Sequence, residues 1–261
     1  MKKQRNKNKN TVKIPRYFVF EGIDGSGKDT QMLHFINYLK NKNKYQNILI
    51  TREPTDNTKE WRKIIERLQN GFKNKEEEIF LYIKDRIKTH KNYKKLLEVN
   101  KDLFIVSSRS ELSTYSYQTE GDINYDTISL FAEKLDKNKD ILHADITFVF
   151  TVSPEKTLKR IKERAKKTWE KLDIFEEEKF LEVAQEKYIA ATFFLSEKYN
   201  MNFIFVDSNG TIEEVTQRMI KGYEEFLVSS TLEEVKEEEK MERVKKVKKA
   251  KKTKKAKKKA K

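Results

Sequence analysis

Short apolar runs alternate along the chain with segments in which apolar residues recur at helical spacing. Each run is four to seven residues long and is bounded by polar or turn-forming residues. Runs of this length are typical of strands that are buried on both faces. The expected strands are 17–21, 47–51, 103–106, 146–152 and 203–206.

The intervals between these runs predict helices. The first helix opens at Lys28 and has an apolar stripe at Met32, Leu33 and Ile36. A later helix starts at Pro154, because proline is favoured at the first helical position, and gives way to a charged stretch at 164–173. Strands that alternate with helices predict an α/β fold, a five-stranded parallel sheet flanked by helices on both faces. The other expected helices cover 61–68, 79–96, 127–135, 180–199 and a last segment that ends near 227.

The most specific chemical signal lies where the first strand meets the first helix. Gly22, four residues, Gly27 and Lys28 have the spacing of a phosphate-binding loop. The chain has seven glycines in all, and three of them lie within these six residues, which argues against a chance match. Backbone N–H groups of such a turn and of the helix N-terminus favour a bound anion. The expected nucleotide-binding residues are Gly22, Ile23, Asp24, Gly25, Ser26, Gly27, Lys28, Asp29 and Thr30.

One position of this loop departs from the pattern. Asp29 occupies the place at which a Ser or Thr hydroxyl usually contacts Mg²⁺. A carboxylate also ligates hard cations, so Asp29 and Asp24 are the candidate metal ligands. Thr30, one residue later, is a possible substitute for the missing hydroxyl.

Charge and cysteine content limit the other possibilities. The net charge is +15, but 243–261 and 1–13 together hold 19 basic and no acidic residues, so the body between them carries −4. A nucleic-acid-binding face on the body is therefore not implied. The absence of cysteine excludes disulfides and thiol catalysis and fits a cytoplasmic protein. No apolar run has the roughly 20 residues of a membrane span.

These observations predict three regions. Residues 1–13 form a disordered basic segment, 14–228 the folded domain, and 229–261 a charged, Lys-rich tail. The tail has two interpretations that stay open: a solubilising extension, or an electrostatic arm that makes weak contact with nucleic acid or an anionic surface.

Polar motifs follow the expected strands. They are Arg52-Glu53-Pro54 after the second strand, 107–109 after the third and 207–210 after the fifth. Ligands of parallel α/β sheets bind at the carboxyl ends of the strands. We therefore expect one site that joins these motifs with the phosphate loop.

Four further segments accompany the loop in a fixed order, and together they resemble the thymidylate kinase family of nucleoside monophosphate kinases. The resemblance implies a phosphate-loop kinase fold with a lid at about 162–176. It also implies transfer of the γ-phosphoryl group of ATP to dTMP, with Mg²⁺ as cofactor, in a homodimer. The segments are Thr51-Arg52-Glu53-Pro54, Asp85-Arg86, Ser108-Arg109-Ser110 with Leu112-Ser113-Thr114 and Tyr117-Gln118, and Leu172-Asp173-Ile174-Phe175-Glu176.

The resemblance also implies roles for single residues. Lys28 and Arg109 would act on the transferred phosphoryl group, and Arg52 would hold the acceptor phosphate. Arg164 is the expected catalytic cation of the lid, with Lys166, Lys167 and Lys171 as alternatives, and Arg160 would contact ATP. Tyr82 and Arg86, one helical turn apart, would stack on the base and bond to its edge. The other expected substrate contacts are Asp24, Glu53, Ser113, Thr114, Tyr117, which would block a ribose 2′-hydroxyl, and Gln118.

Several residues depart from the family pattern. Ser108 replaces a carboxylate and Ile174 stands where the lid often has arginine. We hypothesise that Asp29 compensates for Ser108. His90 follows Asp85-Arg86 one residue later than in the family and is expected on the helix surface, while His34 and His143 are expected to be structural.

Two alternatives to dTMP kinase activity stay open. One is a kinase for other deoxynucleoside monophosphates. The other is a catalytically weak nucleotide-binding module that its basic tail tethers.

Overall fold

The computed structural model describes residues 14–56, 58–168 and 178–232, with side chains left out at 164–168 and 178–180. The chain divides into two compact units. One unit, Pro15–Ile220, holds the sheet and every described residue of the candidate site. The other comprises Met1–Ile14 and Lys221–Lys261, of which residue 14 and the helical residues 221–232 are described.

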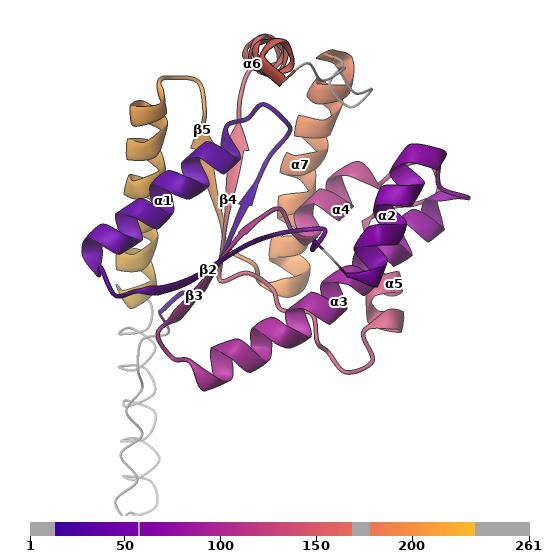
Figure 1. Ribbon diagram of the computed structural model, residues 1–261, viewed down its shortest axis with the longest axis horizontal. Coiled ribbons are helices and arrows are strands. Elements are labelled where there is room, and N and C mark those ends of the chain that lie inside the picture. The colour runs from indigo at the N-terminus through magenta and orange to yellow at the C-terminus, as the bar shows by residue number, and fades with distance from the viewer. Residues whose placement is uncertain (1–13, 57, 169–177, 233–261) are drawn as a thin grey trace, which may run out of the picture. The chain divides into compact units, whose positions relative to one another are not determined.

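A five-stranded parallel sheet forms the centre of the larger unit, with the strand order β2-β3-β1-β4-β5 (Figure 1). The first strand pairs with β3 on one side, with Tyr17 opposite Ile105, and with β4 on the other, with Phe18 opposite Ile146. The predicted α/β fold is thus confirmed, and each strand boundary lies within two residues of its expected place. The strands are β1 Tyr17–Glu21, β2 Asn47–Arg52, β3 Leu103–Ser108, β4 Ile146–Thr151 and β5 Phe203–Asp207.

Side-chain caps mark where several helices begin. Thr58 accepts a hydrogen bond from the Trp61 backbone N–H at the start of α2, and Asn74 does the same for Glu77 at the start of α3. Such caps satisfy N–H groups that the first helical turn leaves without partners. The helices are α1 Lys28–Lys42, α2 Lys59–Asn70, α3 Lys75–Val99, α4 Glu111–Tyr117, α5 Tyr125–Leu135, α6 Pro154–Thr168 and α7 Glu178–Tyr199, followed by helical residues 212–220.

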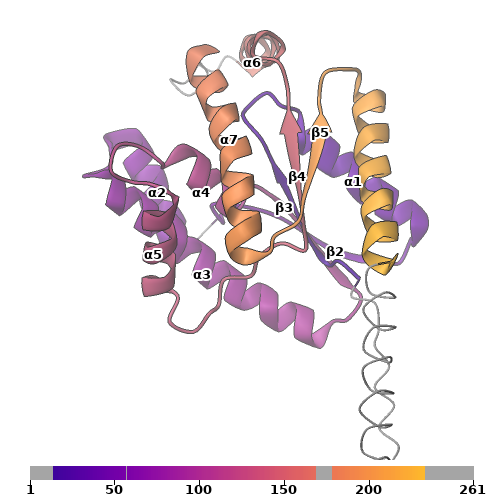
Figure 2. The same cartoon turned by 180° about the vertical axis from the view of Figure 1, so that it is seen from behind.

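Helices cover both faces of the sheet because successive strand residues point to opposite sides (Figures 1 and 2). Phe18 and Phe20 contact Phe35 of α1 on one face. On the other face Tyr17 and Val19 share a cluster with α3 residues such as Tyr93. The inner strands β1, β3 and β4 are buried on both faces, which explains their continuous apolar character. The edge strands β2 and β5 are partly exposed, so the expectation of burial on both faces is wrong for them.

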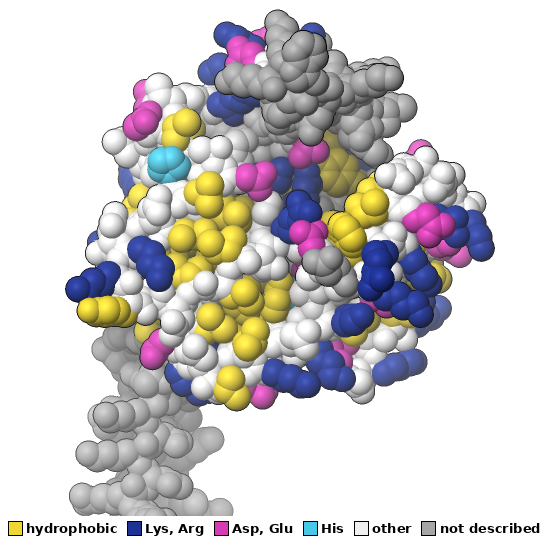
Figure 3. Space-filling model, viewed as in Figure 1, with side chains coloured by type: hydrophobic (Ala, Val, Ile, Leu, Met, Phe, Trp, Pro, Cys, Tyr) yellow, Lys and Arg dark blue, Asp and Glu magenta, His cyan; other side chains and the backbone are white. Residues whose placement is uncertain are grey.

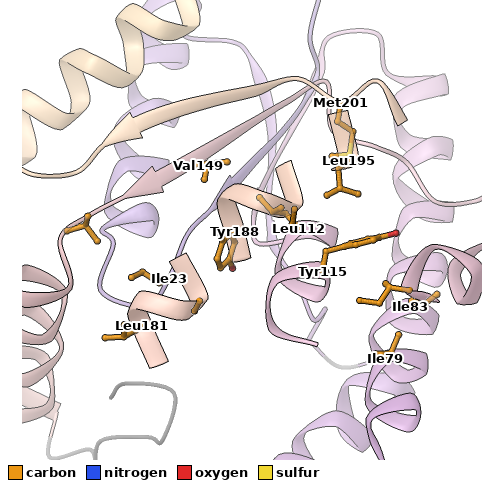
Figure 4. Close-up of a cluster of buried hydrophobic side chains, with 14 of the residues drawn as sticks. Ile23, Ile79, Ile83, Leu112, Tyr115, Val149, Leu181, Tyr188, Leu195 and Met201 are labelled. Atoms are coloured by element: carbon orange, nitrogen blue, oxygen red, sulfur yellow. The ribbon is translucent and has the colours of Figure 1, made fainter. Parts of the chain in front are cut away.

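The largest described cluster of buried side chains joins the sheet to α3, α4, α5 and α7. Figure 4 shows Leu112 and Tyr188 in this cluster, together with Ile23 from the phosphate loop. The loop and the helix that carries Tyr188 are therefore held by the same core.

Two expectations about the helices are wrong. Leu33 is 54% exposed, because the buried face of α1 runs through Met32, Phe35 and Ile36 instead. The helix that starts at Pro154 does not end before Arg164 but continues to Thr168. Its charged side chains are compatible with an exposed helix face, and charge alone does not end a helix.

None of the helices in the described residues combines the length and the apolar character that a membrane crossing requires.

Candidate active site

The phosphate loop leaves β1 at Glu21 and ends where α1 begins at Lys28. Gly22 has a φ of +146°, which L side chains rarely adopt. A Cβ at Gly22 would lie 2.7 Å from the Phe150 carbonyl oxygen and 2.9 Å from Ser26 Oγ. Glycine is therefore required here, because the loop passes directly against β4.

Two cations converge on one carboxylate at the mouth of this loop. Asp24 Oδ1 lies 3.2 Å from Lys28 Nζ and 2.6 Å from Arg109 Nη2, although the cations come from α1 and from the residue after β3. Burial by itself raises the pKa of Asp24, but Arg109 and Lys28 outweigh burial and hold this pKa well below its usual value. Burial and the charge of Arg109 lower the pKa of Lys28. This arrangement places two cationic side chains together at the mouth of the loop, a combination that suits an anionic ligand.

The Arg109 guanidinium is held by several contacts. Its Nη1 donates to Ser113 Oγ at 3.1 Å and to the Tyr188 hydroxyl at 3.0 Å, and the guanidinium carbon lies 5.4 Å from the centre of the Tyr117 ring. The Arg109 backbone has a φ of 65°, and its N–H donates to the Phe20 carbonyl oxygen at 2.9 Å. Left-handed backbone is costly for arginine, so the surrounding contacts must stabilise it.

Glu21 accepts hydrogen bonds from the residues that contact Arg109, a role that the sequence interpretation missed. Its buried carboxylate accepts hydrogen bonds from the backbone N–H groups of Ser110 and Ser113, from Ser113 Oγ and from the Tyr188 hydroxyl. Burial raises the pKa of Glu21 despite the nearby Arg109 charge. The sequence did offer one indication of this role, because Glu21 is an acidic residue at the end of an otherwise apolar strand. A carboxylate that is buried there requires hydrogen-bond partners.

Arg52, the last residue of β2, and Glu53, the residue that follows it, lie in different environments. Arg52 is exposed, and its Nη2 forms an ion pair with Asp56 at 2.6 Å. Glu53 is buried, and its carboxylate lies 2.7 Å from Arg86 Nε and 2.7 Å from His90 Nε2. The expectation that His90 lies on the helix surface is wrong, because it follows Arg86 by one helical turn on the face of α3 that packs against Glu53.

The residues that the family resemblance places around the base lie on α3 and α4. Tyr82 lines the open cleft described below, and burial raises its pKa to about 12. Arg86 Nη2 donates to Thr114 Oγ1 at 3.0 Å, so this pair is buried together. Gln118 Nε2 donates to Glu78 at 3.1 Å. Of these side chains, Tyr82 reaches the cleft, and Arg86 and Thr114 form the layer behind it.

An open cleft of about 710 Å³ joins these parts. One end is polar and is formed by the phosphate loop and the residues after β2 and β3, and the other end is apolar and is formed by α2 and α3. In Figure 3, basic and acidic side chains gather beside apolar ones between the surfaces of α1 and α2. The lining includes Asp24, Lys28, Asp29, Arg52, Glu53, Ser108 and Arg109 at the polar end and Trp61, Ile65, Leu68 and Tyr82 at the apolar end.

The candidate metal ligands Asp24 and Asp29 both line the polar end of the cleft. Ser108 Oγ donates a hydrogen bond to Asp29. Ser108 therefore places a hydroxyl group beside Asp29, the residue that stands where such loops usually have Ser or Thr. Asp29 Oδ2 is 3.9 Å from Lys28 Nζ. Within the described residues no three His, Cys, Asp or Glu side chains cluster as a metal site, but oxygen donors of this kind suit Mg²⁺, which binds through few protein ligands and substrate phosphates. Thr30 is exposed on α1 and is not among the cleft residues.

Arg160 of α6 lies against the phosphate loop. Its Nη1 donates to the carbonyl oxygens of Gly25 and Ser26 at 3.2 and 3.3 Å, and its Nη2 donates to the Ser208 carbonyl oxygen at 2.9 Å. It therefore links the loop to the segment after β5. The side chains of the expected lid cations, Arg164, Lys166, Lys167 and Lys171, and residue Ile174 lie outside the described residues.

Comparison with known proteins supplies an independent result. The sequence model described as Thymidylate kinase matches residues 20–219. A probable thymidylate kinase of Methanocaldococcus jannaschii is 32% identical over 210 residues, which cover 79% of this chain and 94% of the relative. A thymidylate kinase of Thermosipho melanesiensis is 28% identical over 203 residues, covering 76% and 92%.

Proposed function

The chain belongs to the thymidylate kinase family, and we propose from this premise that it transfers the γ-phosphoryl group of ATP to dTMP, giving dTDP and ADP. The observation that carries the proposal is the convergence of Lys28 and Arg109 on Asp24 at the polar end of a cleft. Phosphoryl transfer needs mainly positioning and electrostatic stabilisation, and these two cations supply both.

Lys28 and Arg109 have distinct parts in this mechanism. Incoming phosphate oxygens compete with Asp24 for both cations, and Asp24 keeps the cations in place until then. Lys28, at the start of α1, holds the donor phosphates together with the loop N–H groups. Arg109 presents a planar fork, which spans donor and acceptor phosphates better than a single ammonium group.

The acceptor would lie along the cleft towards α2 and α3. Arg52 is the exposed cation at the polar end and would exchange Asp56 for the acceptor phosphate. Tyr82 and the apolar side chains of α2 would receive the base, with Arg86 behind them. This arrangement supports thymine as the base because an apolar wall suits its methyl group.

Mg²⁺, when bound, would offset the charge of the phosphate groups and assist their transfer. We propose that Asp29 and Ser108 hold it together, the carboxylate from the loop and the hydroxyl from the end of β3. The exchange variant Asp29→Thr/Ser108→Asp tests this pair. We expect the Mg²⁺ concentration needed for half-maximal ATP binding to change by severalfold, and unchanged metal dependence would contradict the assignment.

A turnover assay with a panel of nucleotides tests the function itself. ADP release is measured with ATP and each of dTMP, dUMP, dCMP, dGMP and AMP, and the diphosphate product is identified. Turnover restricted to dTMP supports the proposal, broad turnover supports a relaxed kinase, and ATP binding without turnover supports the nucleotide-binding module. Lys28→Met should abolish turnover, whereas Lys40→Met, at the other end of α1, should retain it.

The assembly and the basic tail stay predictions. We expect a homodimer from the family resemblance, which light scattering of the full chain tests. Deletion of 243–261, which lie outside the described residues, tests the tail. Unchanged retention on DNA and on anionic lipid would support a solubilising role, and a loss of retention that depends on salt would support an electrostatic arm.

A further inference from the structure

The buried histidine of α3 has contacts that define its protonation state. The side chain of His90 is fully buried, and both ring nitrogens have partners. The backbone N–H of Leu142 donates to Nδ1 at 3.0 Å, and Nε2 lies 2.7 Å from Glu53 Oε1. Because an N–H group can donate only to a nitrogen with a free lone pair, Nδ1 carries no proton. The proton of a neutral ring is then on Nε2, directed at the carboxylate.

The same carboxylate has a complete set of donors. Glu53 Oε1 accepts from His90 and from Ser110 Oγ at 3.2 Å, and Oε2 accepts from Arg86 Nε at 2.7 Å. The Tyr17 hydroxyl, 3.2 Å from His90 Nε2, closes the group from β1. With a neutral His90, the charges of Glu53 and Arg86 balance, as a buried pair requires. A protonated ring would instead turn a second N–H towards the Leu142 amide and lose that contact.

This group lies behind the part of the cleft in which the acceptor nucleotide would bind. Glu53 lines the cleft, and Tyr82, one helical turn before Arg86, lines it from α3. We propose that His90 is a positioning residue for the acceptor nucleotide: as a neutral imidazole with its proton on Nε2, it fixes the Glu53 carboxylate and, through it, the Arg86 guanidinium. The role of this end of the cleft rests on the proposed function.

Several elements depend on the same hydrogen bonds. Glu53 belongs to the segment after β2, Arg86 and His90 to α3, Ser110 to the segment after β3, and Leu142 to the connection that precedes β4. Removal of the Nε2–H donor would leave Glu53 with one donor fewer in a buried site, so the carboxylate and Arg86 would relax together. Binding of ATP should change little, because the side chains of Glu53, Arg86 and His90 form no hydrogen bond with the phosphate loop among the described residues, although the Ser110 backbone N–H donates to Glu21, where the loop begins.

Nitrogen-15 NMR of the full chain tests the tautomer without reference to activity. The protein has three histidines, so the His34→Gln and His143→Gln variants assign the His90 signals. We expect a pyrrole-type signal from Nε2 and a pyridine-type signal from Nδ1. A doubly protonated ring or a proton on Nδ1 would overturn the inference, even if every substitution at position 90 prevented folding.

Kinetics of two variants test the positioning role. His90→Leu should raise the KM for dTMP at least about tenfold, because a hydrogen bond to a buried charge is lost. The KM for ATP should stay within about twofold, and His90→Gln, which keeps a donor, should recover most of the loss. Equal increases in both KM values, or no rescue by glutamine, would overturn the proposal. A wild-type chain that does not phosphorylate dTMP would instead overturn the proposed function. The NMR measurement of the His90 tautomer would still test the buried hydrogen-bond network in that case.

Discussion

The substitution Arg109→Lys tests the central claim that a planar guanidinium joins the two halves of the site. Arg109 Nη2 donates to Asp24, and Arg109 Nη1 donates to Ser113 and to Tyr188. The two terminal nitrogens therefore bind different groups of residues. A lysine ammonium keeps the charge but presents a single nitrogen. One ammonium nitrogen cannot occupy the positions of both Nη1 and Nη2, so lysine loses the geometry that holds Asp24 and the hydroxyl pair together.

The expected loss follows from these contacts. An arginine that stabilises the charge of phosphoryl transfer is worth roughly 10³- to 10⁵-fold in rate. Because lysine retains the charge, we expect the lower end, a fall in kcat of about 10³-fold or about 4 kcal/mol of transition-state stabilisation. The free energy of unfolding should fall by only about 1–2 kcal/mol, since roughly two net hydrogen bonds are lost.

The assay measures kcat with both nucleotides saturating, alongside chemical denaturation. Arg16→Lys is the matched control, because Arg16 Nη1 donates to the Leu97 and Asn100 carbonyl oxygens away from the cleft. Arg16→Lys should lower stability by a similar amount and leave kcat within about twofold. If Arg109→Lys kept more than about a tenth of the wild-type kcat, the bridging role of the guanidinium would be refuted.

Two further predictions concern the loop and the half-buried His143. Gly22→Ala should lower the free energy of unfolding by about 3 kcal/mol and abolish ATP binding, because its Cβ would meet the Phe150 carbonyl oxygen. Gly71 also has a positive φ but has open space around it, so Gly71→Ala should lower the free energy of unfolding by only about 1 kcal/mol. Thermal denaturation measures both losses, and similar values would contradict the clash at Gly22. Burial lowers the pKa of His143, but the Glu111 carboxylate, 2.8 Å from Nδ1, outweighs burial and raises it. The contribution of protonated His143 to the free energy of unfolding should be fully present below the ordinary histidine pKa of about 6.5, and it should disappear as the pH rises through the raised pKa of the folded protein. His143→Gln should remove this pH dependence of unfolding.

Local patterns in the chain were sufficient for the strands and for most of the helices, although no pattern predicted α4. The strand at 17–21 and the helix from Lys28 follow from apolar periodicity, and the Gly22 to Lys28 spacing predicts the turn that joins them. These features depend on neighbours within a few residues, so they can be read from one sequence. The α/β architecture follows from the alternation of the elements.

Residues whose partners are distant in sequence could not be placed in this way. Leu33 fits a helical stripe yet is exposed, and His90 was expected at the surface yet is buried. Glu21 supports Arg109 through contacts with α4 and α7 that no local pattern announces.

The sequence by itself determined the strands, most of the helices and the glycine-rich turn before α1, because backbone conformation and burial periodicity are local properties. Only the tertiary structure decided the strand order, the contact between Asp29 and Ser108, and the burial of His90 beside Glu53 and Leu142. The physical reason is that charge balance and hydrogen-bond pairing in a buried site are set by atoms that the fold brings together from distant segments.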